Sequence, residues 1–301
     1  MPRAAIDIGS NSLLLLVVGD DGRVLHDEAR VVGLGRGLGD RGLIASDRLE
    51  AAEVVLGAYV ATAARLGVEA HQIRAVATSA ARRAMNAPTW VARLQRTHGL
   101  RVQIISGDDE ARLSWLGACR DLDLPTGPLL VIDLGGGSTE VVLGEGERIL
   151  GRISLEIGSV RLTEQFLRPG ANGAIDPVGL ARLRNHVDVE VGKVHLDPMP
   201  RTVVGVAGTV TTLATVALGL RSYDAALVHG SKITRADLVR AVDQLLPATP
   251  EQRRALVPAS PERADFLVAG AVILDRLLAA SRRQQLVVSD RGLRYGAVGS
   301  P

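Results

Sequence analysis

The chain of 301 residues has few aromatic side chains: two Phe, two Trp and three Tyr, or 2% of the sequence. Proteins that bind single-stranded nucleic acid stack bases on aromatic rings, so this scarcity argues against a nucleic-acid partner. Lysine is almost as scarce, and nearly all positive charge is on arginine, within a formal net charge of only +2. Arginine guanidinium groups are well suited to phosphate oxygens, which leaves small phosphorylated ligands as candidates.

Cysteine and long apolar runs are also lacking. Cys119 is the single cysteine, so no disulfide framework exists, and its apolar helical context predicts a small buried residue. No apolar run is long enough to span a bilayer, and the N-terminus leads directly into a predicted strand rather than a signal segment. We therefore expect a cytoplasmic protein with no membrane partner. The length favours two domains of ordinary size.

A glycine-rich turn at residues 131–142 is the most informative stretch. An apolar run ends in Asp133, and Gly135, Gly136, Gly137 and Ser138 precede a second β-branched run. Glycines let backbone N–H groups approach a bound anion, and an acid at the strand end is placed to hold a divalent cation on that anion. This pattern predicts a phosphate-and-metal hairpin, although an ordinary tight turn has a similar composition.

The same turn occurs twice. At one constant offset, three residues near the N-terminus match three of the central turn: Asp7, Gly9 and Ser12 correspond to Asp133, Gly135 and Ser138. Residues 22–25 echo residues 147–150 after a slip of one position. This spacing is far longer than the period of a solenoid, so it indicates duplicated domains rather than two unrelated turns. Two such hairpins facing each other would hold a polyphosphate and its Mg²⁺ from both sides.

Hydrophobic periodicity predicts an α/β protein with a mixed sheet in each half. Predicted strands cover 3–8, 12–19, 22–32, 73–77, 102–105, 147–155, 203–206 and 286–288. Predicted helices cover 47–66 with Ser46 as N-cap, 88–98 with Pro88 at the first position, 107–120, 159 onward, 176–191, 208 onward, 234–246 and 261–280. The polar stretch 121–128 has two prolines, and we place the boundary there, with domains at 1–123 and 124–301.

Several helix starts carry candidate functional residues. Ser79 opens a helix directly after a strand, where free N–H groups favour an anion, with Arg82 and Arg83 in its first turns. One of these arginines would contact phosphate, or both are solvated. Asp108, Asp109 and Glu110 open another helix. They either complement its macrodipole or include a functional acid, and composition does not choose between the two.

These segments resemble motifs of the exopolyphosphatase/guanosine-pentaphosphate phosphatase (Ppx/GppA) family. The resemblance follows the family order along the chain and is carried by 5–12, 76–82, 105–113, 131–144, 158–163, 206–213, 228–230, 263–265 and 289–296. It implies two ribonuclease-H-like domains of the actin/Hsp70/sugar-kinase superfamily around an interdomain cleft. The chain is similar to short members without the C-terminal helical domain, which suggests short polyphosphate or pppGpp as substrate.

The resemblance also implies roles for individual residues. Glu110, rather than Asp108 or Asp109, is the implied catalytic acid, because the family places it just before Ala-Arg-Leu; it would deprotonate a water for in-line attack on the terminal phosphorus. Asp7, Asp133 and Glu140 are the implied ligands of Mg²⁺, with Mn²⁺ as an alternative. The implied phosphate-binding residues are Asn11, Ser12, Ser79, Arg82, Gly135, Gly136, Gly137, Ser138, Gly208 and Thr209.

The expected activity is Mg²⁺-dependent release of orthophosphate from inorganic polyphosphate or from guanosine pentaphosphate, by a chain we expect to be a homodimer. Two other functions stay open: a non-catalytic (p)ppGpp-binding regulator, and an ATP-dependent sugar-kinase-like phosphotransferase. Two positions depart from the family pattern. Gly33 stands where many members have Arg, a contact that Arg36 would then supply, and Tyr295 stands where Glu is usual. His229 matches a family loop, where packing or capping is at least as good an explanation as substrate contact.

Overall fold

The computed structural model describes residues 1–38, 42–146, 148–168, 170 and 173–299. The chain divides into two compact units. Unit 1 comprises Met1–Gly117 together with the segment that begins at Leu293, and unit 2 comprises Ala118–Gly292. No helix among these described residues combines the length and apolar character that crossing a membrane requires.

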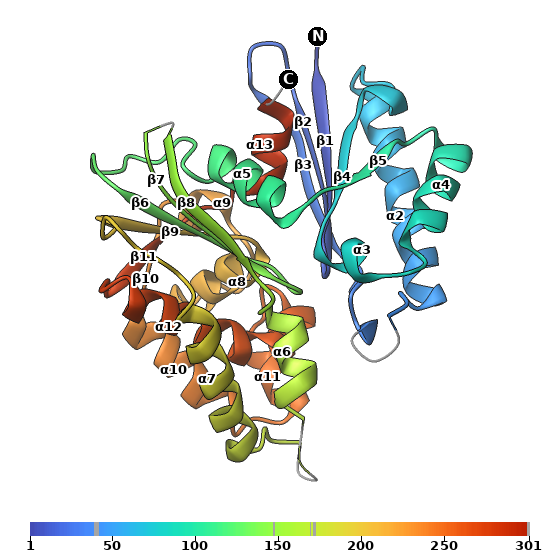
Figure 1. Cartoon of the computed structure of the whole chain (residues 1–301). Helices are drawn as coiled ribbons and strands as arrows, with labels where there is room; N and C mark the ends of the chain where they lie inside the picture. The colour runs from blue at the N-terminus through green and yellow to red at the C-terminus, as the bar shows by residue number, and fades with distance from the viewer. Residues whose placement is uncertain (39–41, 147, 169, 171–172, 300–301) are drawn as a thin grey trace. The chain divides into compact units, whose positions relative to one another are not determined.

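Unit 1 is a five-stranded mixed sheet in the order β3-β2-β1-β4-β5 (Figure 1). Its strands are β1 (Arg3–Ile8), β2 (Ser12–Val18), β3 (Val24–Val31), β4 (Arg74–Ala77) and β5 (Val102–Ile104). Its helices are α2 (Ser46–Arg65), η1 (Ala70–Gln72), α3 (Ser79–Arg83), α4 (Ala87–His98), α5 (Gly107–Ala118) and α13 (Leu293–Gly299). The first three strands are antiparallel, whereas β1, β4 and β5 are parallel.

Strands β1 and β2 are buried on both faces of the sheet of unit 1, and successive side chains of a strand point to opposite faces. Ile6 and Ile8 of β1 pack into a core with Leu56 and Trp90 of the covering helices. Ala5, the residue before Ile6, faces the other side of the sheet and packs into a separate cluster with residues of α13. Both faces therefore need apolar residues, which explains the nearly continuous apolar composition of β1 and β2.

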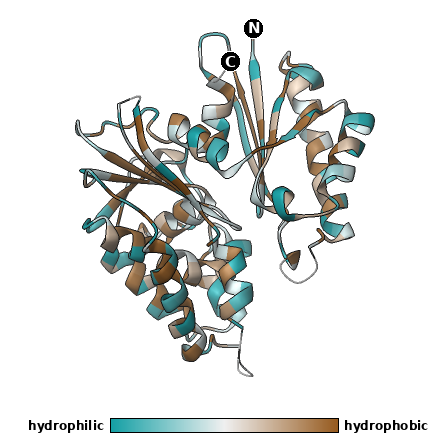
Figure 2. Cartoon of the chain, in the orientation of Figure 1, coloured by the Kyte–Doolittle hydropathy of each residue, from teal (hydrophilic) through white to brown (hydrophobic). Residues whose placement is uncertain are grey.

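Unit 2 is a six-stranded sheet in the order β10-β11-β9-β6-β7-β8. Its strands are β6 (Leu129–Leu134), β7 (Thr139–Glu145), β8 (Arg148–Leu155), β9 (Thr202–Val206), β10 (Lys232–Thr234) and β11 (Gln285–Val288). Its helices are α6 (Ser159–Phe166), α7 (Pro177–Val191), α8 (Gly208–Ala217), α9 (Ala225–Val228), α10 (Arg235–Leu245), α11 (Pro250–Leu256), η2 (Pro261–Phe266) and α12 (Leu267–Ala280). Helix α12 is hydrophobic over most of its surface and lies in the main core (Figure 2).

The structure confirms the duplication. In each unit three antiparallel strands are followed by strands parallel to the first, so β3-β2-β1-β4-β5 matches β8-β7-β6-β9-β11. The two turns also share their closing hydrogen bond: Gly9 N donates to Ser12 O at 3.0 Å, and Gly135 N donates to Ser138 O at 3.1 Å. The α/β class and the ribonuclease-H-like sheet order are confirmed.

Some local predictions were wrong. Helix α2 begins at Ser46 itself, with Ala45 as N-cap and no side-chain cap, because Ser46 already has helical backbone geometry. The predicted helix 261–280 is two elements, η2 and α12, and the short elements α9, α11 and β10 were not predicted. Elements of three to seven residues contain too few residues to show a hydrophobic period.

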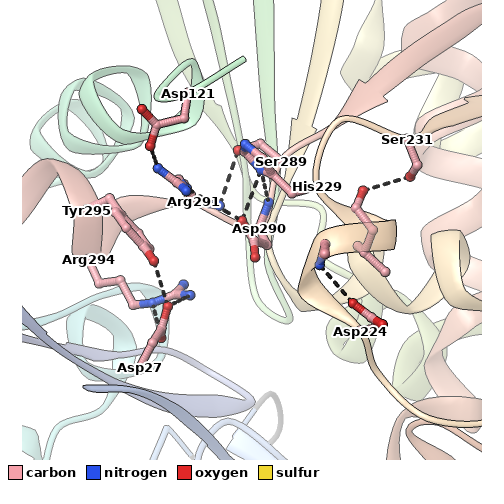
Figure 3. Close-up of polar contacts among 12 residues, drawn as sticks. Asp27, Asp121, Asp224, His229, Ser231, Ser289, Asp290, Arg291, Arg294 and Tyr295 are labelled. Carbon is pink, nitrogen blue, oxygen red and sulfur yellow. Dashed lines mark hydrogen bonds and ion pairs between the residues drawn. The ribbon is translucent and has the colours of Figure 1, made fainter. Parts of the chain in front are cut away.

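The division into units differs from the predicted domains 1–123 and 124–301 in two ways. The first boundary falls after Gly117, and α13, at the end of the chain, belongs to unit 1. Arg294 donates to both carboxylate oxygens of Asp27 at 2.9 Å, and the Tyr295 hydroxyl donates to Asp27 Oδ2 at 2.8 Å (Figure 3). Tyr295 therefore anchors α13 to β3. Residues so distant in sequence meet only in the folded chain.

Cys119 is half-buried rather than buried, and burial raises the pKa of its thiol to about 11. At pH 8 we expect only about one thiol in a thousand to be the reactive thiolate. Alkylation by iodoacetamide, followed by mass spectrometry, should therefore be slow at pH 8 in the native protein and should accelerate in urea. Equal rates in the native and unfolded protein would contradict this expectation.

Candidate phosphate-binding site

The parallel strands of unit 1 end at one edge of the sheet, where several predicted site residues lie. Asp7 is the last residue but one of β1. Thr78 N, just before α3, donates to Ile8 O at 3.2 Å, and Ile105 N donates to Ala77 O at 3.0 Å. Because the carboxyl ends of parallel strands share an edge, the 9–12 turn, α3 and the start of α5 gather there.

Glu110 is distinguished from its two acidic neighbours by burial. Its residue is 7% exposed, whereas Asp108 and Asp109 are exposed. Arg82 Nη1 donates to Glu110 Oε2 at 2.5 Å and to Ile105 O at 3.1 Å. Asp109 instead accepts from the Ser106 hydroxyl at 2.7 Å, which is an ordinary contact at a helix start. Of the three acids, Glu110 alone has the buried setting beside a cation that is typical of a functional carboxylate.

Two polar atoms of unit 1 have a setting that suggests a ligand. Asn11 Oδ1 and Ser79 Oγ are buried and have no hydrogen-bond partner within the described residues. Leaving a buried polar atom unsatisfied costs roughly 1–3 kcal/mol, so such atoms are expected where a ligand completes the hydrogen bonding. Both were predicted as phosphate-binding residues, and Ser12 closes the same turn through its carbonyl. Helix α3 has only five residues, so its dipole adds little.

In unit 2 the glycine turn has N–H groups that secondary structure does not use. Gly135 N closes the turn onto Ser138 O. Within the described turns and loops, Gly136, Gly137 and Ser138 donate no backbone hydrogen bond. Free N–H groups in a glycine turn form an anion-binding concavity. Phosphate binding by residues 135–138 stays a prediction.

Asp133 and Glu140 are opposed residues of the antiparallel pair β6–β7. Opposed residues project from the same face of the sheet, and these two are 8% and 1% exposed. Glu140 Oε1 also accepts from the Ser154 hydroxyl at 2.7 Å. Two buried carboxylates on one face repel each other unless a cation neutralises them, so this pair fits a hard divalent ion.

Unit 1 offers less to a metal ion, because Leu14 stands opposite Asp7 where unit 2 has Glu140. Among the described residues, no group of three or more His, Cys, Asp or Glu side chains could hold a metal ion. Mg²⁺ is usually bound through one or two carboxylates, substrate phosphates and waters rather than by a cage of protein ligands. The donor set of Asp133 and Glu140 therefore fits Mg²⁺ that arrives with a phosphorylated substrate.

Gly208 and Thr209 open α8 directly after β9, as predicted. Ala207 precedes them with φ of 76°, a conformation that is strained for alanine and is concentrated at functional sites. The Thr209 hydroxyl lies 3.0 Å from the Ser159 hydroxyl. The hydroxyl pair thus ties the start of α8 to the start of α6.

Arg263 is a candidate that the sequence prediction missed. A Cβ on Gly208 would overlap its guanidinium group, so the arginine lies directly against the start of α8. Burial lowers its pKa, although the nearby Glu262 and Tyr223 act in the opposite direction. A desolvated guanidinium is well suited to an anion. The segment 263–265 was one of those that carry the family resemblance, so it could have pointed to Arg263. The sequence does not show, however, that Arg263 lies against Gly208.

Two further residues have structural roles. His229 Nδ1 lies 3.0 Å from Asp290 Oδ1, which ties the end of α9 to the loop after β11 (Figure 3). This agrees with the packing interpretation of His229.

The Arg36 side chain folds back over Gly33. A Cβ added at Gly33 would lie 2.7 Å from Arg36 Nε. Gly33 has φ of 70°, which favours glycine at this position.

Comparison with known proteins places this geometry in a family. The model of the Ppx/GppA phosphatase family matches residues 17–300. Exopolyphosphatase 2 of Mycobacterium tuberculosis is 36% identical over 97% of this chain and 96% of its own length. The crystal structure of the Aquifex aeolicus Ppx/GppA family member has a TM-score of 0.80 at 34% identity, over 98% of this chain and 95% of that one. An exopolyphosphatase structure from Cytophaga hutchinsonii has a TM-score of 0.88 at 25% identity, over 98% and 96%. The chain belongs to the Ppx/GppA phosphatase family.

Proposed function

We propose that this chain hydrolyses the terminal phosphoanhydride bond of inorganic polyphosphate and releases orthophosphate, and that guanosine pentaphosphate is a second substrate with the same terminal bond. Family membership makes the chain a phosphoanhydride hydrolase. The observation that carries the proposal is the 135–138 turn, whose unused N–H groups adjoin the buried carboxylates of Asp133 and Glu140. The N–H groups can donate hydrogen bonds to phosphate oxygens, and the carboxylates can bind a cation that accompanies the phosphate.

The proposed metal is Mg²⁺, with Mn²⁺ as an alternative. Asp133 and Glu140 would hold it, and Asp7 is a third candidate ligand at the end of β1. When bound, the ion supplies positive charge that offsets the negative charge of the phosphate oxygens. The chain adds N–H donors in the 135–138 turn, the guanidinium of Arg263 and the hydroxyl of Thr209.

Glu110 is the proposed general base. Its carboxylate would accept a proton from a water molecule, and the water oxygen would attack the terminal phosphorus in line with the departing phosphate oxygen. The hydrogen bond from Arg82 Nη1 to Glu110 Oε2 holds the Glu110 side chain in one orientation. The Asn11 amide NH2 and the hydroxyls of Ser12 and Ser79 would donate hydrogen bonds to the phosphate oxygens.

The names of two relatives support polyphosphate as the substrate, since the Mycobacterium tuberculosis and Cytophaga hutchinsonii proteins are both named as exopolyphosphatases. The scarcity of aromatic residues offers few stacking surfaces for a guanine base, which favours polyphosphate over the nucleotide. Both substrates end in the same chemical group, so the phosphate-binding turn serves either one.

The test is orthophosphate release, measured in parallel from short polyphosphate, long polyphosphate and pppGpp with Mg²⁺, with Mn²⁺ and with EDTA. We expect release from polyphosphate that requires the divalent ion. Release from pppGpp alone would move the assignment to the nucleotide. Binding of pppGpp without release from any substrate would overturn the hydrolase assignment in favour of a (p)ppGpp-binding regulator.

A further inference from the structure

Two carbonyl groups of the 135–138 turn, those of Gly135 and Gly136, accept hydrogen bonds from the first N–H groups of α6. Ser159 N donates to Gly135 O at 3.0 Å, and Val160 N and Arg161 N both donate to Gly136 O at 3.0 Å. The first N–H groups of a helix have no partner within that helix, and here they are satisfied by the turn. The contact thus uses donors that α6 would otherwise leave exposed.

Holding these carbonyls fixes the direction of the neighbouring N–H groups. In a planar trans peptide the C=O of one residue and the N–H of the next point in opposite directions. With Gly135 O and Gly136 O directed at α6, the N–H groups of Gly136 and Gly137 must point away from it. The N–H groups that the phosphate site needs are therefore oriented before any ligand arrives.

Gly158 allows this close approach. A Cβ there would lie 2.5 Å from the carbonyl carbon and oxygen of Gly136 and from the nitrogen of Gly137. Gly158 has φ of −136°, which every residue adopts, so its backbone conformation does not demand glycine. The requirement is space alone, and any side chain would push the turn out of position.

Unit 1 repeats the arrangement with a loop in place of a helix. Gly35 N donates to Ser10 O at 2.7 Å, while Val32 N and Gly33 N donate to Asn11 O at 2.9 and 2.8 Å. Two segments share a Gly-x-x-Arg pattern at the same slipped offset as 22–25 and 147–150: Gly33-Leu34-Gly35-Arg36 and Gly158-Ser159-Val160-Arg161. In this alignment the bond from Gly35 to Ser10 corresponds to the bond from Val160 to Gly136.

We propose that the Gly-x-x-Arg segments 33–36 and 158–161 are positioning elements, which hold the carbonyls of the 9–12 and 135–138 turns so that the N–H groups of each turn are aimed at phosphate. Gly158 is the critical positioning residue. The inference rests on the proposed function for the identity of the ligand, but the orientation of the turn is a property of the chain without ligand.

The test compares two substitutions that disturb opposite ends of α6. Gly158→Ala places a Cβ against the turn, whereas Gly179→Ala places one against the carbonyl oxygen of Phe166, the last residue of α6. Both should lower the melting temperature, but only Gly158→Ala should move the turn. In ¹H–¹⁵N spectra of the full chain, amide signals of Gly136 and Gly137 should shift in Gly158→Ala and stay in place in Gly179→Ala.

Titration with inorganic tripolyphosphate and Mg²⁺ then measures the consequence. We expect Gly136 and Gly137 amides to respond to tripolyphosphate in the wild-type and Gly179→Ala proteins, and Gly158→Ala to bind at least tenfold more weakly. Wild-type affinity in Gly158→Ala, or turn amides that do not respond in the wild-type protein, would overturn the proposal. Tripolyphosphate binding without hydrolysis would refute the proposed function and leave the positioning role supported.

A second pair of variants serves if Gly158→Ala does not fold. Ser159→Pro removes the N–H that donates to Gly135 O, at a first helical position whose backbone conformation proline readily adopts. Ser159→Ala keeps that N–H and removes only the hydroxyl. Weak tripolyphosphate binding in Ser159→Pro alone supports the positioning role, and equal binding in the two variants contradicts it.

Discussion

Replacing Glu110 by glutamine is expected to abolish phosphate release while the protein stays folded. The amide has nearly the same shape, so it keeps a hydrogen bond from Arg82, but it cannot accept a proton from water. Loss of a general base typically lowers the turnover number by about 10²–10⁴-fold. Steady-state orthophosphate release from polyphosphate measures the loss, and circular dichroism with thermal unfolding verifies the fold.

Asp109→Asn is the matched control for this prediction. Asp109 is the preceding residue on the same helix, but it is exposed and pairs with the Ser106 hydroxyl. We expect its turnover number to stay within about twofold of wild type, because neither its charge nor its contact reaches the buried pair. A wild-type rate in Glu110→Gln, or a collapse of activity in Asp109→Asn, would make the assignment of the base wrong.

Gly296→Ala is expected to destabilise unit 1 strongly. A Cβ at this position would overlap the carbonyl oxygen of Leu113 in α5, and backbone cannot move aside as a flexible side chain can. Overpacking of this kind costs roughly 3 kcal/mol or more. For a unit of this size that corresponds to a melting temperature lower by about 10 °C, which calorimetry would detect.

Gly292→Ala provides the comparison, four residues earlier along the chain, just before α13 and at the last residue of unit 2. A Cβ there meets only Val206 side-chain atoms at 4.0 Å, which is ordinary van der Waals contact. Its melting temperature should stay within about 2 °C of wild type. Equal stability in Gly296→Ala and Gly292→Ala would show that α13 does not pack against α5 as the structure describes.

The repeated architecture and the residues that form the two turns could be predicted from the order of amino acids alone. Alternating apolar strands, glycine turns and the order of Asp7, Gly9 and Ser12 are local patterns. A local pattern depends only on residues that are close together in the sequence, so it can be recognised without the structure. The family could be identified for the same reason, since its motifs are short segments in a fixed order. The roles of Mg²⁺ and of the implied ligands stay predictions.

Three features could be known only from the folded chain. Glu110 is the one of three consecutive acids that is buried beside an arginine, because Arg82 meets it from another element. Arg263 lies against Gly208, and Tyr295 anchors the last helix to β3. Each of these contacts joins residues that are 28 to 268 positions apart along the chain. Such contacts depend on how sheets and helices pack, and no local pattern in a single sequence specifies them.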